Sequence, residues 1–562
     1  MAGRRFLPAL ACLLLATPAL AQAPEPAALR ARLRSADADT ERIALLELGR
    51  RERPSLIPLI VPMLRSPLPE IRAQAADAIG QAAHGWLSIP PTRNDAVPLA
   101  SVVDALIARL KMETEPTVRA AITETIGRLP YTTPVQVTTA ATALLQAALA
   151  DTVSDRLGIA KGLEALVRLN RPLALLAADD VVVRLRRLVA SDASRDARIR
   201  RLSLTALITL DEVDDTTVAR AAGDPDTQVR RLAMRAAALG TLQASSQAAR
   251  DALMKGLADE AAMVRFEALA GTSGDSMCPA ARAATADRDV HVALLAFDKL
   301  ARCGEDADVM LLEHTVNDLS DAGTPRGWHK AAHALVALVT VAPDRGRAAL
   351  PQFVGSKNWP LRMYAARAAA ALQDRATLEH LAADENENVK EAAIEGLRGL
   401  GAYPAAPKPR RRAAATAEPS ADAARSLSSL HARVVVRNVG TFEMALLVPE
   451  APAAVERLVS LARSGYFEGM VIRRVVPNLT VEAGAGMSGA AGDDLAQREV
   501  GLWPHVRGSV GIDGDSTFFI DLVDNPQFDH QYTVFAQLLS GMDVVDALLE
   551  GDVIERVDVV KP

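Results

Sequence analysis

Residues 514–532 read GDSTFFIDLVDNPQFDHQY and decide the fold of the C-terminal part of the chain. They include Phe518, Phe519, Phe528 and Tyr532, although aromatic residues make up only 3% of the whole sequence. The residues around these rings are glycines and charged or amide side chains, whereas an ordinary buried strand is a run of apolar residues. The cluster of rings therefore needs an explanation beyond the filling of a core.

The composition describes a soluble protein with more than one structural unit. The chain has 562 residues, which is too many for a single ordinary hydrophobic core. Hydrophobic residues make up 49%, charged residues make up 23%, and the formal net charge is −6. This charge gives no general reason to expect nucleic-acid binding. The low aromatic content favours helices that pack through small and aliphatic side chains.

The first residues have the pattern of a cleaved signal peptide. Arg4 and Arg5 give a basic start, an apolar stretch follows, and Ala19 and Ala21 have the A-x-A spacing of a cleavage site. We therefore predict a signal peptide over residues 1–21. A membrane anchor is the competing interpretation, but the apolar stretch is short, and no later stretch predicts a membrane span. The expected mature protein is exported, either periplasmic or secreted.

Export leaves Cys278 and Cys303 as the only cysteines of the mature chain. In an oxidising compartment such a pair forms a disulfide more readily than a metal or catalytic site, and two separately buried thiols are the alternative. Their separation is about that of one helix pair, so we expect them on neighbouring helices and close enough to bridge. The sequence has no histidine-rich cluster and no HExxH spacing, so no metal site is predicted.

A short phrase recurs within residues 22–401 and predicts an array of helical repeats. Each copy has a turn with Pro, Asp or Asn, then an aliphatic residue and a base, then apolar residues at three- and four-residue intervals. Such self-similarity is typical of a solenoid, because each helix pair buries its apolar face only against its neighbours. The aliphatic–base pairs are Ile71-Arg72, Val118-Arg119, Ile199-Arg200, Val229-Arg230, Val264-Arg265, Leu361-Arg362 and Val389-Lys390.

The phrase resembles the HEAT repeat family, particularly its bacterial relatives with a D-x-x-V-R pattern. In that family the Asp and Arg tie adjacent repeats together. The resemblance implies that Asp226 with Arg230, and Asp259 with Arg265, are local versions of this contact. The Val-Arg pairs are then architectural, although arginines on a concave surface can also bind acidic partners. We expect the array to be a scaffold for a protein partner that the sequence does not identify.

Residues 402–430 predict a flexible linker. Pro, Ala and Ser dominate this stretch, and the helical periodicity of the array is lost. Such a composition buries too little apolar surface to order itself, so we expect the preferred proteolytic cut here.

Residues 431–562 form a separate domain with short β-branched runs. RVVVRNVGTFEMALLV alternates around Asn438 and Gly440 as in a β-hairpin, and PEAPAAVERLVSLARSGYF predicts a helix from about Pro452 to Gly465. GMVIRRVVPNLTVEAG and QYTVFAQLL predict further strands, and the closing segment predicts a short helix and a last strand. The predicted fold class is multidomain, with an all-α solenoid followed by a β-barrel with flanking helices.

These segments, in this order, resemble the cyclophilin family of peptidyl-prolyl cis-trans isomerases. GTFEMALLVPEAPAAVERLVSLARSGYFEGMVIRRVVPN matches the family's opening strands, helix and catalytic strand. RGSVGID, STFFIDL, FDHQYTVFAQLLSGMDVVDAL and GDVIERVDVV match its middle and end. The resemblance covers residues 433–560. It implies an isomerase that assists protein folding, acts on proline-containing polypeptides and needs no cofactor.

The resemblance places the catalytic arginine at Arg474, with Arg473 in a preceding, outward position. An X-Pro bond isomerises slowly because amide resonance must be broken, at a barrier of ~20 kcal/mol. A hydrogen-bond donor to the prolyl nitrogen stabilises the twisted state, so no nucleophile or general base is required. Arginine suits this role because it stays charged and presents a fixed fork of N–H groups.

The same resemblance explains the aromatic cluster. Phe519 maps to the floor of the proline pocket, and Phe528 and Tyr532 map to its wall. The alternative is that all the rings are barrel core, which we prefer for Phe518 and Phe535.

The rim of the pocket departs from the family pattern. Leu479 replaces a Phe, Glu482 replaces a Gln, and Thr517 replaces the Gln before the Phe-Phe pair. We expect all three to contact substrate, and we expect Glu482 to weaken the reaction by pairing with the catalytic arginine. Gln527 stands where an aromatic residue often packs on the substrate.

Three functions follow from these observations. The first is an exported prolyl isomerase on a HEAT-type scaffold that recruits clients. The second is a catalytically weak or inactive cyclophilin-like module that binds peptides, which the altered rim favours. The third is a structural adaptor with the barrel as an appendage, against which Arg474 and Phe519 argue.

Overall fold

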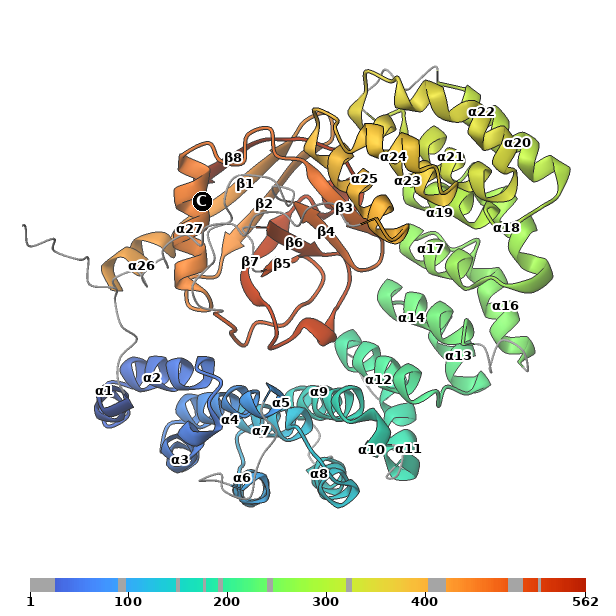
Figure 1. Cartoon of the computed structure of the whole chain (residues 1–562). Coiled ribbons are helices and arrows are strands. Elements are labelled where there is room, and N and C mark those ends of the chain that lie inside the picture. Colours follow the sequence, from blue (N-terminus) through green and yellow to red (C-terminus); the bar gives the residue numbers. More distant parts are fainter. Residues whose placement is uncertain are drawn as a thin grey trace, which may run out of the picture.

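The protein is a long array of helices followed by a β-barrel, as the computed structural model in Figure 1 shows. The predicted fold class is therefore confirmed. The predicted signal peptide lies outside the described residues, and within them no helix is long and apolar enough to cross a membrane. The structure describes residues 26–88, 98–147, 152–174, 178–190, 196–239, 246–319, 326–402, 421–483, 499–513 and 517–561.

The array consists of short helices joined by tight turns. Its α-helices are α1 (Pro26–Arg32), α2 (Ala38–Arg50), α3 (Ile57–Ile60), α4 (Pro69–Ala83), α5 (Gly85–Ser88), α6 (Leu99–Met112), α7 (Pro116–Arg128), α8 (Pro134–Ala147), α9 (Val153–Leu169), α10 (Arg171–Ala174), α11 (Ala178–Val189), α12 (Ala197–Leu210), α13 (Asp215–Ala221), α14 (Thr227–Ala237), α16 (Gln247–Gly256), α17 (Ala262–Gly271), α18 (Met277–Ala284), α19 (Val290–Leu300), α20 (Asp306–Asn317), α21 (His329–Val341), α22 (Pro343–Val354), α23 (Trp359–Ala371), α24 (Arg375–Leu381) and α25 (Glu387–Gly399). Its 3-10 helices are η1 (Pro54–Leu56), η2 (Val61–Arg65) and η4 (Gly274–Ser276).

A helix begins at the recurring phrase because the turn residue compensates for a backbone N–H that has no partner within the helix. The Asp226 carboxylate accepts a hydrogen bond from the backbone N–H of Val229 at 2.9 Å, at the start of α14. In α7, Pro116 takes the first helical position, where a backbone N–H has no intrahelical partner to lose.

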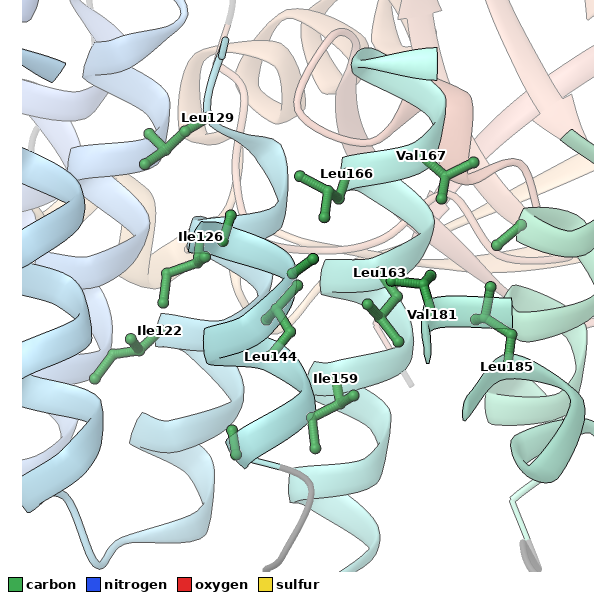
Figure 2. Close-up of a cluster of buried hydrophobic side chains, with 14 of the residues drawn as sticks. Ile122, Ile126, Leu129, Leu144, Ile159, Leu163, Leu166, Val167, Val181 and Leu185 are labelled. Atoms are coloured by element: carbon green, nitrogen blue, oxygen red, sulfur yellow. The ribbon is translucent and has the colours of Figure 1, made fainter. Parts of the chain in front are cut away.

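Aliphatic side chains between neighbouring helices form the core of the array. Figure 2 shows Ile122 and Ile126 of α7, Leu163 of α9 and Leu185 of α11 in this core. Helices α7 and α9 cross so closely that a Cβ at Gly127 would lie 1.9 Å from the carbonyl oxygen of Gly162. The contact between these two helices therefore requires glycine.

The arginines of the phrase join neighbouring units in a ladder of ion pairs. Our prediction of local pairing is wrong: Arg230 pairs with Asp259 at 2.9 Å, and Arg265 pairs with Asp287 at 2.8 Å. Each arginine therefore reaches the acidic residue of the following unit. The long guanidinium side chain spans the gap between units, while Asp226 instead caps α14 and pairs with Arg201. The same pattern joins Arg72 to Glu113, Arg119 to Asp155, Arg200 to Asp224 and Arg362 to Asp384.

The two cysteines of the array are joined by a disulfide. Cys278 lies in α18, its Cα is 5.8 Å from that of Cys303, and the two sulfur atoms are bonded. Cys303 lies in the turn after α19 and not within a helix, so the expectation of two helical positions is wrong for this residue.

The structure also differs from the predicted linker. Helix α26 (Ala421–Leu427) lies within the range 402–430, and Leu427 and Leu430 are buried in the core of the barrel. Helix α26 and the residues after it therefore belong to the barrel domain, because the barrel supplies the apolar contacts that their own composition lacks. Residues 403–420 lie outside the described part of the chain.

The barrel is a curled antiparallel sheet with the strand order β3-β4-β6-β5-β7-β2-β1-β8. A bridge between Val471 and Val553 brings its two edge strands together. The predicted hairpin is present, with Asn438 in its turn at a φ of 60°. The elements are β1 (His431–Val436), β2 (Gly440–Leu446), α27 (Pro452–Arg463), β3 (Ile472–Val476), β4 (Thr480–Ala483), β5 (Ser509–Asp513), β6 (Thr517–Asp521), η5 (Pro526–Phe528), β7 (Thr533–Ser540), α28 (Met542–Asp546) and β8 (Ile554–Val560).

The array bends in an arc around the barrel (Figure 1). Contacts between the array and the barrel occur along the array from α2 to α23. They join Arg50 to the carbonyl of Glu450, Glu124 to His530, Arg201 and Gln228 to Asp524, Glu267 to Asn478, Arg326 to Asp552, and Arg367 to Glu550.

Candidate functional site

The residues of the predicted site form one row across neighbouring strands. Arg474 of β3 lies directly opposite Glu482 of β4, and Glu482 lies opposite Phe519 of β6. Phe519 in turn lies opposite Gly511 of β5. Because residues directly opposite one another share a face of a sheet, the guanidinium, the carboxylate and the ring belong to one surface of the barrel.

That surface is the outer one. Phe518 and Ile520, which flank Phe519 along β6, belong to the barrel core, as does Phe535 of β7. Since side chains alternate along a strand, Phe519 points to the opposite side. The prediction that Phe518 and Phe535 are core residues is confirmed.

Gly511 makes room for the ring of Phe519. A Cβ at position 511 would lie 2.4 Å from Cζ of that ring, far inside van der Waals contact. The residue opposite Phe519 must therefore lack a side chain for the ring to lie flat across β5. Sequence reasoning missed this contact between Gly511 and Phe519.

Four rings meet around the predicted pocket. The centroid of Phe519 lies 5.7 Å from that of Phe528 and 5.6 Å from that of Tyr532, both edge-on. His505, which sequence reasoning missed, stacks on Phe519 at 5.6 Å with an interplanar angle of 15°. Phe519, Phe528 and Tyr532 are thus brought together as predicted, and His505 supports their floor.

A buried polar network holds this floor in place. Nδ1 of His505 lies 2.8 Å from the carboxylate of Asp521, and Nδ2 of Asn525 donates to the same carboxylate at 2.7 Å. Asn525 also donates to the carbonyl of Leu479 at 3.1 Å. Burial raises the pKa of Asp521, against the hydrogen bond from His505, which lowers it. The network fixes the turn with Leu479 relative to β6.

Glu482 binds both arginines of β3. Its carboxylate lies 3.4 Å from Nη1 of Arg474 and 3.3 Å from Nη2 of Arg473. A register shift between Ile472 and Arg474 lets both side chains reach one carboxylate, so Arg473 lies on the same outer surface as Arg474. Arg474 remains the more exposed of the two, with 63% of its side chain accessible against 33% for Arg473.

The remaining predicted residues lie on the β3–β4 turn, on β6 and in η5. Leu479 is half-buried in the turn between β3 and β4. Thr517 begins β6, opposite Asp513 of β5. Gln527 lies in η5, where its side-chain amide donates to Asn525 at 3.0 Å. Among the residues that the structure describes, no group of His, Cys, Asp and Glu has the arrangement of a metal site.

This geometry suits a reaction without covalent chemistry. The rings of Phe519, Phe528 and Tyr532 form an apolar cluster, and the accessible guanidinium of Arg474 is the hydrogen-bond donor in the same row as Phe519. An apolar ring bound beside a cationic donor is what the twisting of a prolyl bond requires.

Comparison with known proteins agrees with this geometry. Residues 431–562 match the family model described as cyclophilin type peptidyl-prolyl cis-trans isomerase/CLD. A peptidyl-prolyl cis-trans isomerase of Helicobacter pylori (strain ATCC 700392 / 26695) is 33% identical over 132 residues, covering 21% of this chain and 81% of that protein. A probable peptidyl-prolyl cis-trans isomerase of Brucella abortus (strain 2308) is 31% identical over 134 residues, covering 20% of this chain and 68% of that protein.

The chain therefore belongs to the cyclophilin-type peptidyl-prolyl cis-trans isomerase family through its C-terminal domain. Among solved structures, a cyclophilin type peptidyl-prolyl cis-trans isomerase of Cryptosporidium parvum matches with a TM-score of 0.22 and 17% identity, covering 24% of this chain and 98% of that one. The cyclophilin AquaCyp293 of Hirschia baltica matches with a TM-score of 0.20 and 15% identity, covering 25% of this chain and 81% of that one.

Proposed function

We propose that this protein is an exported prolyl isomerase that assists the folding of proline-containing polypeptides. The observation that carries the proposal is the row formed by Arg474, Glu482 and Phe519 on the outer face of the barrel. The row combines the donor and the apolar floor that the reaction needs, on a domain of the isomerase family.

In the proposed mechanism the proline ring of the substrate binds against the cluster of Phe519, Phe528 and Tyr532. Removal of the ring from water holds one side of the prolyl bond while the other side rotates. Arg474 donates a hydrogen bond to the prolyl nitrogen as amide resonance is lost, which stabilises the twisted state more than either planar state. A donor of this kind is worth about 3 kcal/mol, or on the order of a hundredfold in rate.

Glu482 lowers the activity in this proposal. Its carboxylate draws N–H groups of Arg474 toward β4, so that they are partly withdrawn from the prolyl nitrogen. We therefore propose an activity that is low but measurable. A peptide-binding module without useful catalysis is the second candidate, and the same ion pair is the observation that favours it.

Export and the scaffold role are parts of the same proposal. The disulfide between Cys278 and Cys303 supports export, because disulfides persist in oxidising compartments and are rare in the cytosol. The Arg–Asp ladder supports the resemblance to HEAT repeats, since it ties each unit to the next. We propose that the array presents clients or partner proteins to the barrel.

The test is a protease-coupled isomerase assay of the full-length protein on a succinyl-Ala-Ala-Pro-Phe-p-nitroanilide peptide. We expect wild-type protein to accelerate the cis-to-trans conversion, and Arg474→Ala to abolish the acceleration while peptide binding persists. Peptide binding without acceleration by wild-type protein would select the binding module instead.

A further inference from the structure

The turns that hold the pocket residues are also turns by which the barrel contacts the array. The β3–β4 turn contains Leu479, and its neighbour Asn478 reaches α17. The segment after η5 contains Tyr532, and His530 of that segment reaches α7. Two walls of the pocket thus touch helices of the array that lie far apart in the sequence.

The contact of His530 lies in a buried and charged environment. Its Nε2 lies 3.1 Å from Oε1 of Glu124, and Glu124 also binds Nζ of Lys161 at 2.9 Å. Burial lowers the pKa of His530 to about 4, so its neutral ring donates to the carboxylate. Burial alone would raise the pKa of Glu124, but Lys161 and the bond from His530 lower it. Glu124 is therefore an ionised acceptor.

The contact of Asn478 is a pair of hydrogen bonds to a single helix. Its Nδ2 donates to the carbonyl of Met263 and to the carboxylate of Glu267, each at 2.9 Å. Nη1 of Arg231 lies 3.6 Å from the same carboxylate. The side-chain amide therefore has two acceptors on α17, which define its position more sharply than one would.

Both contact residues have a left-handed backbone. The φ angles are 60° for Asn478 and 62° for His530, a conformation that marks a tight reversal of the chain. Between them in the sequence, Asp524 binds Nη1 of Arg201 at 2.8 Å and Nε2 of Gln228 at 3.1 Å. The array therefore contacts the barrel at three places around the pocket, one in the β3–β4 turn and two in the connection between β6 and β7.

We propose that the array is a positioning device for the isomerase pocket, in which Glu124 and Glu267 are positioning residues. Glu267 holds Asn478 and thereby the turn with Leu479. Glu124 holds His530 and thereby the segment with Phe528 and Tyr532. The first partner of the array is thus the chain's own C-terminal domain. This inference rests on the proposed function, because it concerns the same pocket.

The physical reason is that surface turns are mobile unless they are tied down. The helices of the array are packed into a continuous core, so their side chains are rigid anchors. A pocket wall that moves by about 1 Å loses much of its complementarity to a twisted proline. Anchoring the turns from outside the barrel therefore raises both binding and turnover.

The test uses full-length variants on both sides of the contact, of which those at Glu267 leave the barrel sequence unchanged. Glu267→Ala removes one of the two acceptors of Asn478, whereas Glu267→Gln keeps a side-chain oxygen that accepts from it. Asn478→Gly removes the contact from the other side, and glycine keeps the positive φ without strain. Glu550→Gln is the matched control, since Glu550 joins the barrel to Tyr364 and Arg367 without touching a pocket turn.

The readouts are kcat/KM for the succinyl-Ala-Ala-Pro-Phe peptide, its Kd, and hydrogen exchange of residues 477–482. For Glu267→Ala and Asn478→Gly we expect kcat/KM to fall about fivefold or more, Kd to rise, and exchange to accelerate. The kcat/KM values of Glu267→Gln and Glu550→Gln are expected to stay within about twofold of wild type. Combining Glu267→Ala with Asn478→Gly is expected to lower kcat/KM no further than Asn478→Gly alone, because the contact is shared.

Unchanged kcat/KM and Kd in both Glu267→Ala and Asn478→Gly would overturn the inference, as would an equal loss in Glu550→Gln. Absence of turnover in wild-type protein would instead contradict the proposed function. In that case the Kd values of the variants for the peptide decide whether contacts with the array hold the pocket in place.

Discussion

Glu482 lies directly opposite Arg474 in the β3–β4 ladder, with their carboxylate and guanidinium groups 3.4 Å apart. The same carboxylate also binds Arg473, so one acidic side chain holds two cations at the edge of the barrel. The ion pair orients the guanidinium of Arg474 but also occupies some of its N–H donors. The balance between these two effects sets the activity that we expect.

Gly511→Ala is expected to lower both stability and activity. The added Cβ would lie 2.4 Å from Phe519, so the ring must tilt away from β5 into the pocket. We expect a loss of about 2 kcal/mol in the free energy of unfolding and a rise in KM. Urea unfolding and steady-state kinetics measure these effects. Gly304→Ala is the control, because a Cβ there meets no atom within 4 Å; equal behaviour of the two variants would contradict the account.

The carboxylate of Glu113 makes the array sensitive to acid. Burial would raise the pKa of Glu113, but hydrogen bonds from Arg72, from the backbone of Glu115 and from Arg109 lower it to about 2, against a usual value of 4.5. A lowered pKa means that this stabilisation is complete above about pH 4.5 and is lost as the pH falls toward 2.

Glu113→Gln is therefore expected to destabilise the array by about 3 kcal/mol at pH 7, and the difference from wild type should shrink below pH 4.5. Unfolding midpoints in urea at several pH values measure this change. Glu305→Gln, which affects the exposed pair with Arg282, should have little effect at any pH. A difference for Glu113→Gln that is independent of pH would show that the charge of Glu113 is not what stabilises the array.

Removal of the disulfide is expected to destabilise the array alone. Cys278 and Cys303 are separated by 25 positions in the sequence, and a closed loop of this size contributes about 3 kcal/mol. The double variant Cys278→Ala/Cys303→Ala should lower the melting temperature of the helical signal in circular dichroism. Wild-type protein treated with reductant should behave in the same way, and insensitivity to reductant would contradict a bonded pair in solution.

Local patterns were sufficient for much of the fold. The hairpin at Asn438 and the alternation of Phe518 and Phe519 follow from turn chemistry and from the two-residue period of a strand, and both are present. The pairing of Arg474 with Glu482 followed instead from the resemblance to the cyclophilin family, in which Glu482 takes the place of a Gln that orients the arginine, and the pair is present.

Contacts between distant segments were not predictable from local patterns. Gly511 and His505 matter because of Phe519, which the fold brings to them from another strand. Helix α26 is ordered by apolar contacts of Leu427 with the barrel, which its own composition does not reveal. His530 and Glu124 are separated by 406 positions, and no periodicity relates them.

The most direct test of the account is the isomerase activity of Glu482→Gln beside that of wild type and Arg474→Ala. Glutamine keeps the side-chain length but removes the charge that holds the guanidinium, so more of the N–H fork is free for the prolyl nitrogen. In exchange NMR of a proline peptide with the full-length protein, we predict an increase in kcat/KM of about tenfold for Glu482→Gln and no activity for Arg474→Ala. Equal rates for wild type and Arg474→Ala, or no turnover by either wild type or Glu482→Gln with the peptide still bound, would contradict the account.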